Sequence, residues 1–274
     1  MRSRPVGDPG LVVHREPADR QPAAGGPPDR ARADRRRGGA DGGGRADGHG
    51  LTGVSSERYN GRPPQTRVIP AGTVLHRISG TGSPYPPNSF NVAGIRTLGD
   101  PLQGRFEPID TSHGGYLYVA LTMAGAVAEG ILRDIPIPRS GIVRRKRLAG
   151  KTHTRMVLSR DITVASLLDG DLGSLNLSGT LVGCDRSAYT WSRTTCHQIL
   201  GADPHTDGVI YRCRNNPAEF ALMLLDRGTL DPAALGIAES NDVLTDPSTF
   251  DEVVKVLDEV HHLKYVGSGG ARLP

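Results

Sequence analysis

The sequence predicts an α+β fold in one folded region of about 200 residues. Between residues 66 and 263, strand-like and helix-like segments alternate irregularly, without the regular strand–helix repeat of a doubly wound parallel sheet. The same region contains most of the aromatic residues and all of the isoleucines. We therefore expect a single domain over residues 66–263, built on one hydrophobic core.

The first 50 residues have a low-complexity composition. Gly, Pro, Arg, Ala and Asp fill 40 of these 50 positions, and none of the 12 aromatic residues of the chain occurs there. Such a segment has too little apolar surface to offset the entropy lost on ordering. We expect residues 1–65 to be a disordered extension and linker, and residues 264–274 a flexible tail. The skew is also typical of GC-rich DNA translated without selection for folding, which favours a start site downstream of Met1.

Charge and cysteine content exclude several classes of protein. The formal net charge is +4, and +3 of it belongs to residues 1–50, so the folded region is close to neutral and a nucleic-acid partner is disfavoured. The sequence contains neither a run of 18 apolar residues nor a secretory signal, so we expect no membrane association and a cytoplasmic location. The three cysteines, Cys184, Cys196 and Cys213, are too few for a disulfide framework and match no metal-binding spacing. We therefore expect no metal site.

In the first half of the folded region, the pattern predicts two strands, a long loop and a helix. Residues 73–78 (TVLHRI) are rich in β-formers and follow a turn, so they are expected to form a strand. Residues 80–104 are rich in Gly and Pro and predict a long loop, and 116–120 (YLYVA) predict a second strand. Thr122 is the expected N-cap of a helix that runs to Arg133.

In the second half, residues 162–168, 209–214 and 219–225 are expected to form strands. Asp185 is the expected cap of a helix that ends at Leu200.

The last predicted helix has the clearest signal in the chain. Ser248 and Asp251 have the spacing of a capping box, with Asp in place of the usual Glu. The helix then carries a stripe of apolar residues at helical spacing: Phe250, Val253, Val254, Leu257 and Val260.

Three charged residues lie in apolar surroundings and are the candidates for chemistry. Arg77 belongs to the first strand, Arg105 to a turn, and Glu129 to the predicted helix. One turn before Glu129, Gly125 and Ala126 are too small to cover the helix, so another element is expected to pack close to it and bury the carboxylate. One interpretation is a structural Arg–Glu pair. The other is a pocket with cations for phosphate and a carboxylate for a developing positive charge.

Four segments, in order, resemble the pattern of the RES domain family, the toxin half of a class of bacterial toxin–antitoxin systems. Arg77 matches an Arg near the end of the first strand, and residues 104–108 (GRFEP) match a G-R-[FW]-N-P turn. Residues 117–120 (LYVA) match an L-Y-x-A strand that leads into a helix with a glutamate, here Glu129. Residues 207–214 (DGVIYRCR) match a D-G-[IV]-x-Y-x-S-R strand.

The resemblance implies a mixed sheet with flanking helices, like that of ADP-ribosyltransferases, and an enzyme that degrades NAD. Members break the bond between nicotinamide and ribose, with phosphate or water as acceptor, so NAD is a substrate and no cofactor is expected. Glu129 would stabilise the oxocarbenium-like ribose, while Arg77 and Arg105 would bind the diphosphate or the attacking phosphate. Tyr118 would stack on the nicotinamide ring, and Cys213 would make a minor polar contact. A small helix-turn-helix-type antitoxin is the implied partner.

Three features depart from the family pattern. Glu107 replaces the Asn of the turn, Cys213 replaces the Ser that supplies the last letter of the family name, and residues 80–104 form a long loop for the family. Two alternatives therefore stay open. The protein could transfer ADP-ribose to a macromolecule, or it could be a non-catalytic binding module in which the Arg–Glu pair is structural.

Overall fold

A computed structural model describes residues 57–100, 102–133, 135, 141–227 and 230–267. The chain divides into two units after Leu51, and the first unit lies outside the described residues. The predictions for residues 1–56 and 268–274 therefore cannot be compared with the structure.

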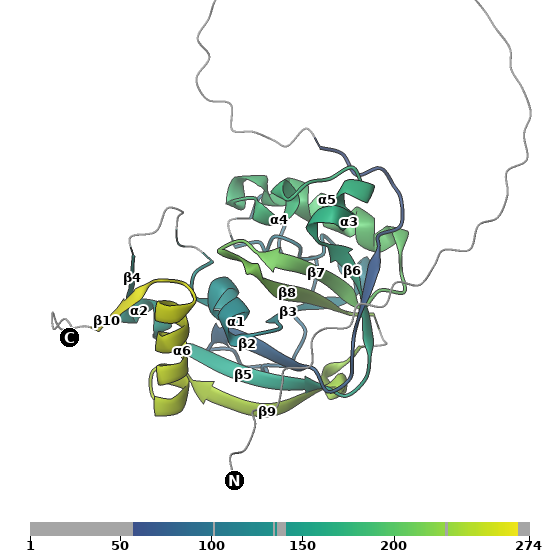
Figure 1. Cartoon of the computed structure of the whole chain (residues 1–274). Coiled ribbons are helices and arrows are strands. Elements are labelled where there is room, and N and C mark those ends of the chain that lie inside the picture. The colour runs from purple at the N-terminus through teal and green to yellow at the C-terminus, as the bar shows by residue number, and fades with distance from the viewer. Residues whose placement is uncertain (1–56, 101, 134, 136–140, 228–229, 268–274) are drawn as a thin grey trace, which may run out of the picture. The chain divides into compact units, whose positions relative to one another are not determined.

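The second unit consists of strands, helices and short 3-10 turns (Figure 1). The strands are β1 (Thr66–Ile69), β2 (Val74–Gly80), β3 (Gly115–Ala120), β4 (Ile142–Arg144), β5 (Lys151–Leu158), β6 (Ile162–Leu167), β7 (Gly208–Cys213), β8 (Asn216–Asp226), β9 (Leu235–Asp242) and β10 (Lys264–Val266). The helices are α1 (Met123–Gly130), α2 (Arg145–Leu148), α3 (Asp169–Ser174), α4 (Thr180–Gly183), α5 (Tyr189–Ala202) and α6 (Pro247–Glu259). The 3-10 turns are η1 (Thr111–His113), η2 (Arg186–Ala188) and η3 (Pro232–Ala234).

Eight of these strands form one mixed sheet, which confirms the predicted α+β class. Their order is β1-β6-β7-β8-β3-β2-β5-β9. The pair β6–β7 is parallel and the other neighbours are antiparallel. The pair β2–β3 is joined in register at one position, His76 opposite Ala120, whereas β2 pairs with β5 along its whole length. The sheet therefore has a seam between β2 and β3.

The two faces of the sheet bury different cores. On β3, Tyr116 and Ala120 point into a core shared with α1, α3, α4, α5 and α6, whereas Leu117 and Val119 point into a second core. The buried residues of this second core come from the strands of the sheet and from residues 230–235. The strands thus curve around their own apolar side chains, and α1 lies in the opening between the two halves of the sheet (Figure 1).

Helix α1 confirms the predicted cap and the predicted close packing. Thr122 is the N-cap, and its side chain accepts a hydrogen bond of 2.9 Å from the backbone nitrogen of Gly125. A Cβ atom on Gly130 would lie 2.8 Å from the backbone oxygen of Ile78. The small residues therefore allow α1 to approach β2 directly. The helix ends at Gly130, three residues before the predicted end at Arg133.

The other two predicted helices are present, but their caps differ from the prediction. Asp185 caps the turn η2, and the longer helix α5 begins at Tyr189 without a side-chain cap and ends at Ala202. In α6 the N-cap is Asp246, two residues before the predicted Ser248. Pro247 at the first helical position favours this earlier start, because its fixed φ suits a helix and its missing N–H needs no partner there.

The apolar stripe of α6 is buried only in part. Val253 and Leu257 are fully covered, and Phe250 packs against the same core. Val260, the last residue of the predicted stripe, lies beyond the helix end and is 40% exposed.

The folded region extends beyond both predicted boundaries. Before residue 66, the backbone nitrogen of Asn60 donates to Leu175, and the Trp191 indole donates to the carbonyl of Glu57. After residue 263, strand β10 pairs in parallel with β4. Residues 57–65 and 264–266 are thus part of the domain, since their backbone groups are bonded to it.

Candidate active site

Strand β2 places Arg77 in the wall of a cavity at the seam of the sheet. Its guanidinium donates a hydrogen bond to the carbonyl of Pro87, and burial lowers the pKa of Arg77 to about 10. Among the residues that the structure describes, Arg77 forms no ion pair. A largely buried cation without a counter-charge favours an anionic ligand beside it.

The predicted turn at residues 104–108 places Arg105 in the interior rather than in this cavity. Arg105 is 4% exposed, and its guanidinium lies 5.6 Å, 5.9 Å and 5.8 Å from the ring centres of Phe106, Tyr189 and Tyr211. Gly104 is required at the start of the turn, because a Cβ atom there would lie 2.9 Å from the hydroxyl of Tyr118. Aromatic faces stabilise the buried cation through their quadrupoles.

Arg105 keeps its charge because of an acidic neighbour. Burial alone would lower the pKa of Arg105, but Glu129, together with Tyr189 and Tyr211, raises it above its usual value. The Nε and Nη1 atoms of Arg105 are buried and have no hydrogen-bond partner among the described residues. Two donors of a buried guanidinium are therefore available to a ligand or to water.

Glu129 lies in the last turn of α1 and is half-buried. Its carboxylate interacts electrostatically with Arg105 and with Arg133, which follows the helix. No such interaction joins Glu129 to Arg77 within the described part of the chain. The structure thus brings together Arg105 and Glu129, and the second arginine beside Glu129 is Arg133 rather than Arg77.

Tyr118 lies beside this pair. Its hydroxyl accepts a hydrogen bond of 2.9 Å from the backbone nitrogen of Phe106, and burial raises the pKa of Tyr118. Tyr211 of β7 packs edge-on against the ring of Phe106, at 4.8 Å between ring centres. Burial and the charge of Glu129 also raise the pKa of Tyr211. Both phenols therefore stay protonated, and Tyr211 is a neutral aromatic neighbour of Glu129.

Cys213, at the end of β7, is fully buried next to Glu129. Its Sγ atom lies 3.9 Å from the carbonyl oxygen of Gly125 in α1, a weak hydrogen bond. Burial and the carboxylate of Glu129 raise the pKa of the Cys213 thiol. A thiol held in the protonated form is a poor nucleophile, so the surroundings of Cys213 disfavour a role in covalent catalysis.

The Asp207–Gly208 pair of the last motif is structural. The Asp207 carboxylate accepts hydrogen bonds of 2.9 Å from the backbone of Thr163 and 2.8 Å from Arg160. Gly208 has a φ of 149°, and a Cβ atom there would lie 2.1 Å from the carbonyl oxygen of Met223. These two residues fix the start of β7, whereas Tyr211 and Cys213 of the same motif lie near Glu129.

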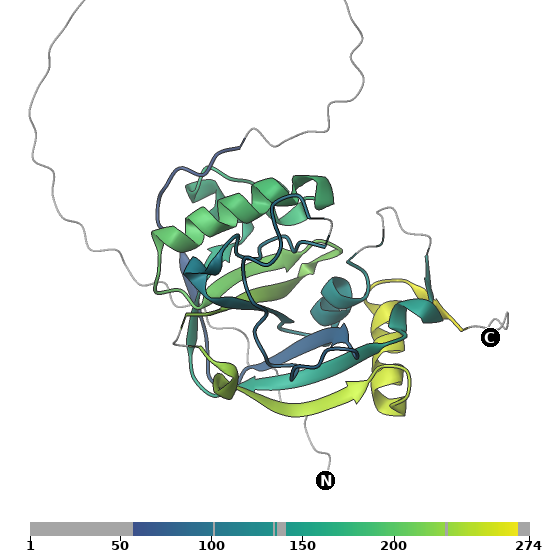
Figure 2. The same cartoon turned by 180° about the vertical axis from the view of Figure 1, so that it is seen from behind.

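The cavity next to Arg77 has a volume of about 460 Å³. This size lies within the range of small-molecule sites, roughly 300–1,000 Å³. Its lining includes the long loop between β2 and η1, which crosses between the two halves of the sheet in Figure 2. The polar lining comprises Arg77, Arg96, Asn91, Glu107, Tyr116 and the hydroxyls of Ser79, Thr81, Ser83, Ser89, Thr152 and Ser240. Of the predicted site residues, Arg77 lines this cavity, while Arg105, Glu129, Tyr118 and Cys213 form the neighbouring cluster.

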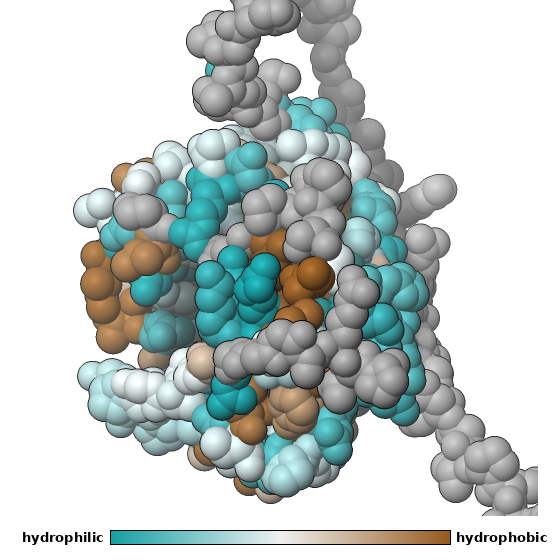
Figure 3. Space-filling view, turned by 90° about the vertical axis from the view of Figure 1, so that its left-hand side faces the viewer, coloured by the Kyte–Doolittle hydropathy of each residue, from teal (hydrophilic) through white to brown (hydrophobic). Residues whose placement is uncertain are grey.

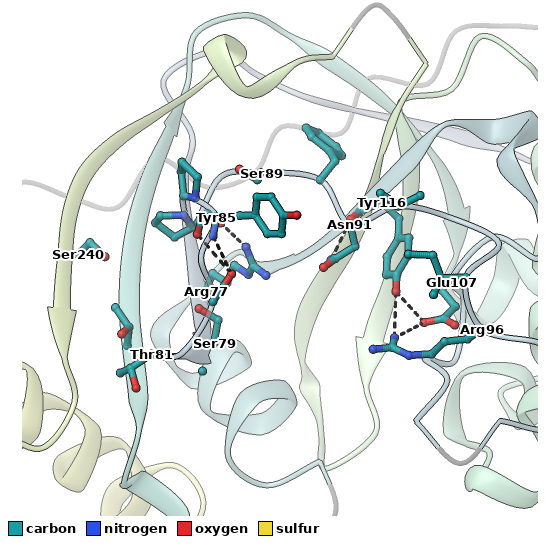
Figure 4. Close-up of a pocket in the computed structure, with 18 of the residues that line it drawn as sticks. Arg77, Ser79, Thr81, Tyr85, Ser89, Asn91, Arg96, Glu107, Tyr116 and Ser240 are labelled. Atoms are coloured by element: carbon teal, nitrogen blue, oxygen red, sulfur yellow. Dashed lines mark hydrogen bonds and ion pairs between the residues drawn. The ribbon is translucent and has the colours of Figure 1, made fainter.

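Glu107, which replaces the family Asn, connects the turn to the cavity. It is 2% exposed and accepts hydrogen bonds from the backbone of Gly104 at 2.8 Å, from the Tyr116 hydroxyl at 2.9 Å and from Arg96 at 3.2 Å (Figure 4). Arg193 lies 3.5 Å from its other carboxylate oxygen. The substitution thus introduces a buried negative charge that two arginines compensate.

Arg193 in α5 is a residue that sequence reasoning missed. It is 1% exposed and donates to five oxygens of residues 96–108: the carbonyls of Arg96, Thr97, Glu107 and Pro108 and the side chain of Gln103. The only signal in the sequence was an Arg among apolar positions of a predicted helix. Arg96 and Arg133 were missed because neither lies in a recognised motif.

Other kinds of site have little support in the part of the chain that the structure describes. Within it, no three His, Cys, Asp or Glu side chains are placed to hold a metal ion. Of the helices in the described ranges, none has both the length and the apolar character needed to span a bilayer. On the face shown in Figure 3, polar residues separate the apolar ones into small groups.

Comparison with known proteins agrees with the resemblance that the motifs indicate. The model of the RES domain family matches residues 74–244, a range that contains Arg77, Arg105, Glu129 and Cys213. Because this match covers more than half of the chain, the protein belongs to the RES domain family.

A solved structure described as the "Crystal structure of the M.tuberculosis MbcT-MbcA toxin-antitoxin complex" contains a chain similar to this one. The match covers 68% of this chain and 91% of that chain, with 15% identity and a TM-score of 0.46. No curated protein matches the sequence.

Proposed function

We propose that the protein is a RES-type toxin that cleaves the nicotinamide–ribose bond of NAD, with phosphate or water as acceptor. The observation that carries the proposal is the pairing of Glu129 with Arg105 inside a cluster of tyrosines, next to a cavity whose wall bears Arg77. Departure of nicotinamide leaves an oxocarbenium-like ribose, and a fixed carboxylate stabilises that charge.

In this proposal each residue of the cluster has a distinct task. Glu129, which lies between Arg105 and Arg133, faces the developing positive charge of the ribose. Arg105 offers its two free buried N–H groups to an oxygen of the substrate, and Arg77 binds the diphosphate from the cavity wall. Tyr118 supplies an aromatic face for nicotinamide, since its hydroxyl is held by Phe106 and its ring cannot turn freely.

The acceptor is a small molecule in this proposal. Cys213 forms no covalent intermediate, because its thiol is buried and its pKa is raised. Phosphate or water would attack the ribose, the bond to nicotinamide would break, and nicotinamide would leave with the bonding electrons.

The direct test follows nicotinamide release from NAD by the purified full chain, with and without inorganic phosphate. We expect release by the natural protein and a loss of at least 100-fold in Glu129→Gln, in line with removal of one key electrostatic group. Glu259→Gln, on the exposed end of α6, is the matched control and should retain full activity. Absence of release, or equal release by both variants, would contradict the proposal. Label from NAD retained on macromolecules would instead indicate ADP-ribosyl transfer.

We also propose a small helix-turn-helix-type antitoxin as the protein partner. Support comes from family membership and from the exposed apolar side chains of the loop beside the cavity. Five of them are 47–73% exposed: Tyr85, Val92, Ile95, Leu98 and Leu102. Apolar residues gathered next to a site favour a protein interface. Growth arrest on expression, relieved by co-expression of the neighbouring gene, is expected, and relief should fail when Ile95 and Leu102 are both changed to Asp.

A further inference from the structure

Arg96 presents a second cation to the cavity, from a loop that the family motifs do not include. Its side chain is 39% exposed, and only its Nη1 atom is engaged, at 3.2 Å from the Glu107 carboxylate and 3.1 Å from the Tyr116 hydroxyl. Within the described residues, its Nε and Nη2 atoms make no hydrogen bond. The guanidinium is thus held from one side, and its other donors remain available.

The charge around Arg96 is positive despite its ion pair. One carboxylate, Glu107, is shared by Arg96 and Arg193, so these three groups carry a net charge of +1. Arg193 is fully covered, whereas Arg96 lines the cavity. The surplus charge therefore reaches a ligand through Arg96.

Arg77 and Arg96 lie on different sides of the cavity, with Asn91 between them (Figure 4). Each can bind an anionic group of its own, and an arginine binds phosphate oxygens in pairs through its planar fork. The hydroxyls of the lining add further hydrogen-bond donors to the cavity.

We infer that Arg96, held by Glu107 and Tyr116, forms a second phosphate-binding subsite of this cavity, distinct from that of Arg77. Glu107, which replaces the family Asn, is part of this subsite, because a neutral amide would leave Arg96 without its ion pair. This inference rests on the proposed function for its substrate, which is either a phosphate group of the dinucleotide or the inorganic phosphate that acts as acceptor.

Anion binding tests the subsite without any need for catalysis. Calorimetry with inorganic phosphate and with inorganic pyrophosphate, at constant ionic strength, would compare the full chain with Arg96→Gln. We expect the Kd of at least one anion to rise tenfold or more. Arg155→Gln is the matched control, because Arg155 is 45% exposed, forms an ion pair of the same 3.2 Å length with Glu239, and does not line the cavity. Its Kd values should change less than twofold, although the change in net charge is identical.

The source of the phosphate group follows from kinetics of nicotinamide release. A higher KM for inorganic phosphate in Arg96→Gln assigns the subsite to the acceptor, and a higher KM for NAD assigns it to the dinucleotide. Arg96→Lys, which keeps the charge, should recover part of the affinity and provides a second variant if Arg96→Gln does not fold. The inference is overturned if Arg96→Gln and Arg155→Gln bind both anions equally well. A natural protein that binds anions but releases no nicotinamide would contradict the proposed function and leave the subsite intact.

Discussion

Replacement of Arg193 by Met is predicted to release the loop that forms one side of the cavity. Arg193 is 1% exposed and holds five oxygens of residues 96–108, in addition to its contact with the Glu107 carboxylate. Met fills a similar volume but donates no hydrogen bond. The variant therefore leaves buried carbonyl groups without their donor and removes one of the two arginines that compensate the buried Glu107 carboxylate.

The expected loss is large on the scale of a single domain. Removal of one partner from a buried ion pair costs about 3–5 kcal/mol, and the orphaned carbonyls do not add fully to this value because they belong to one network. A domain of this kind has about 5–15 kcal/mol of total stability. Arg193→Met should thus remain folded near room temperature but unfold much more easily.

Urea denaturation and hydrogen exchange together measure the effect. We expect the free energy of unfolding to fall by about 3–5 kcal/mol and the amides of residues 96–108 to lose protection first. Arg155→Met, which breaks an exposed ion pair, should cost less than about 1 kcal/mol. If Arg193→Met costs no more than this control, or if exchange of residues 96–108 is unchanged, Arg193 does not organise the loop. Arg193→Lys serves in place of Met if the latter variant does not fold.

Three further experiments test other parts of the structure. Gly130→Ala should destabilise the protein by about 1–3 kcal/mol, because the new Cβ would lie 2.8 Å from the Ile78 carbonyl oxygen. The control is Gly173→Ala in α3, where a Cβ meets nothing within 4 Å, and this variant should be neutral or stabilising in thermal melts. Burial lowers the pKa of the stacked His76 and His153 to about 4, and nearby positive charge adds to this effect, from His153 and then Arg155 on His76 and from Arg155 on His153. The neutral imidazoles stabilise the fold fully above pH about 6.5, and the free energy of unfolding should fall as the pH drops from there toward 4. In acid titrations followed by circular dichroism, His153→Gln should lose less stability over this range. All three cysteines are buried, so native protein should show no fast-reacting thiol with a thiol reagent and three after denaturation; fast labelling of Cys213 would contradict its burial.

The class of fold and most strands could be predicted because their signals are local. Residues 116–120 and 219–225, which are rich in apolar and β-forming side chains, fall within strands β3 and β8, and the predicted strand 73–78 begins one residue before β2. The caps of α5 and α6 were wrong, because several residues near each start have suitable side chains and only the tertiary contacts select among them. Prediction of the order of the strands was out of reach, since it depends on pairs between β5 and β9 that lie far apart in sequence.

The candidate site could be predicted where charge lay in apolar context, as for Arg105 and Glu129. The place of Arg77 was different, because Arg77 shares a face of β2 with Leu75 of the second core, whereas α1 with Glu129 packs against Ile78 on the other face. Arg96 and Arg193 were missed because their meaning depends on Glu107, which meets them only in the folded chain. The available clue in the sequence was Glu107, an acid at a position where the family pattern has Asn.

The single register pair between β2 and β3 has a mechanical consequence. Arg77 belongs to the part of the sheet formed by β2, β5 and β9. Arg96 is bonded to Glu107 and to Tyr116 of β3, and therefore to the other part of the sheet. A phosphorylated molecule that contacts both arginines therefore links the two parts of the sheet across the weakly paired β2–β3 boundary. At 100 times its Kd, such a molecule stabilises the folded state by about 2.7 kcal/mol. Part of this gain should appear as slower separation of β2 from β3, so substrate occupancy and the rigidity of the sheet are linked properties of this fold.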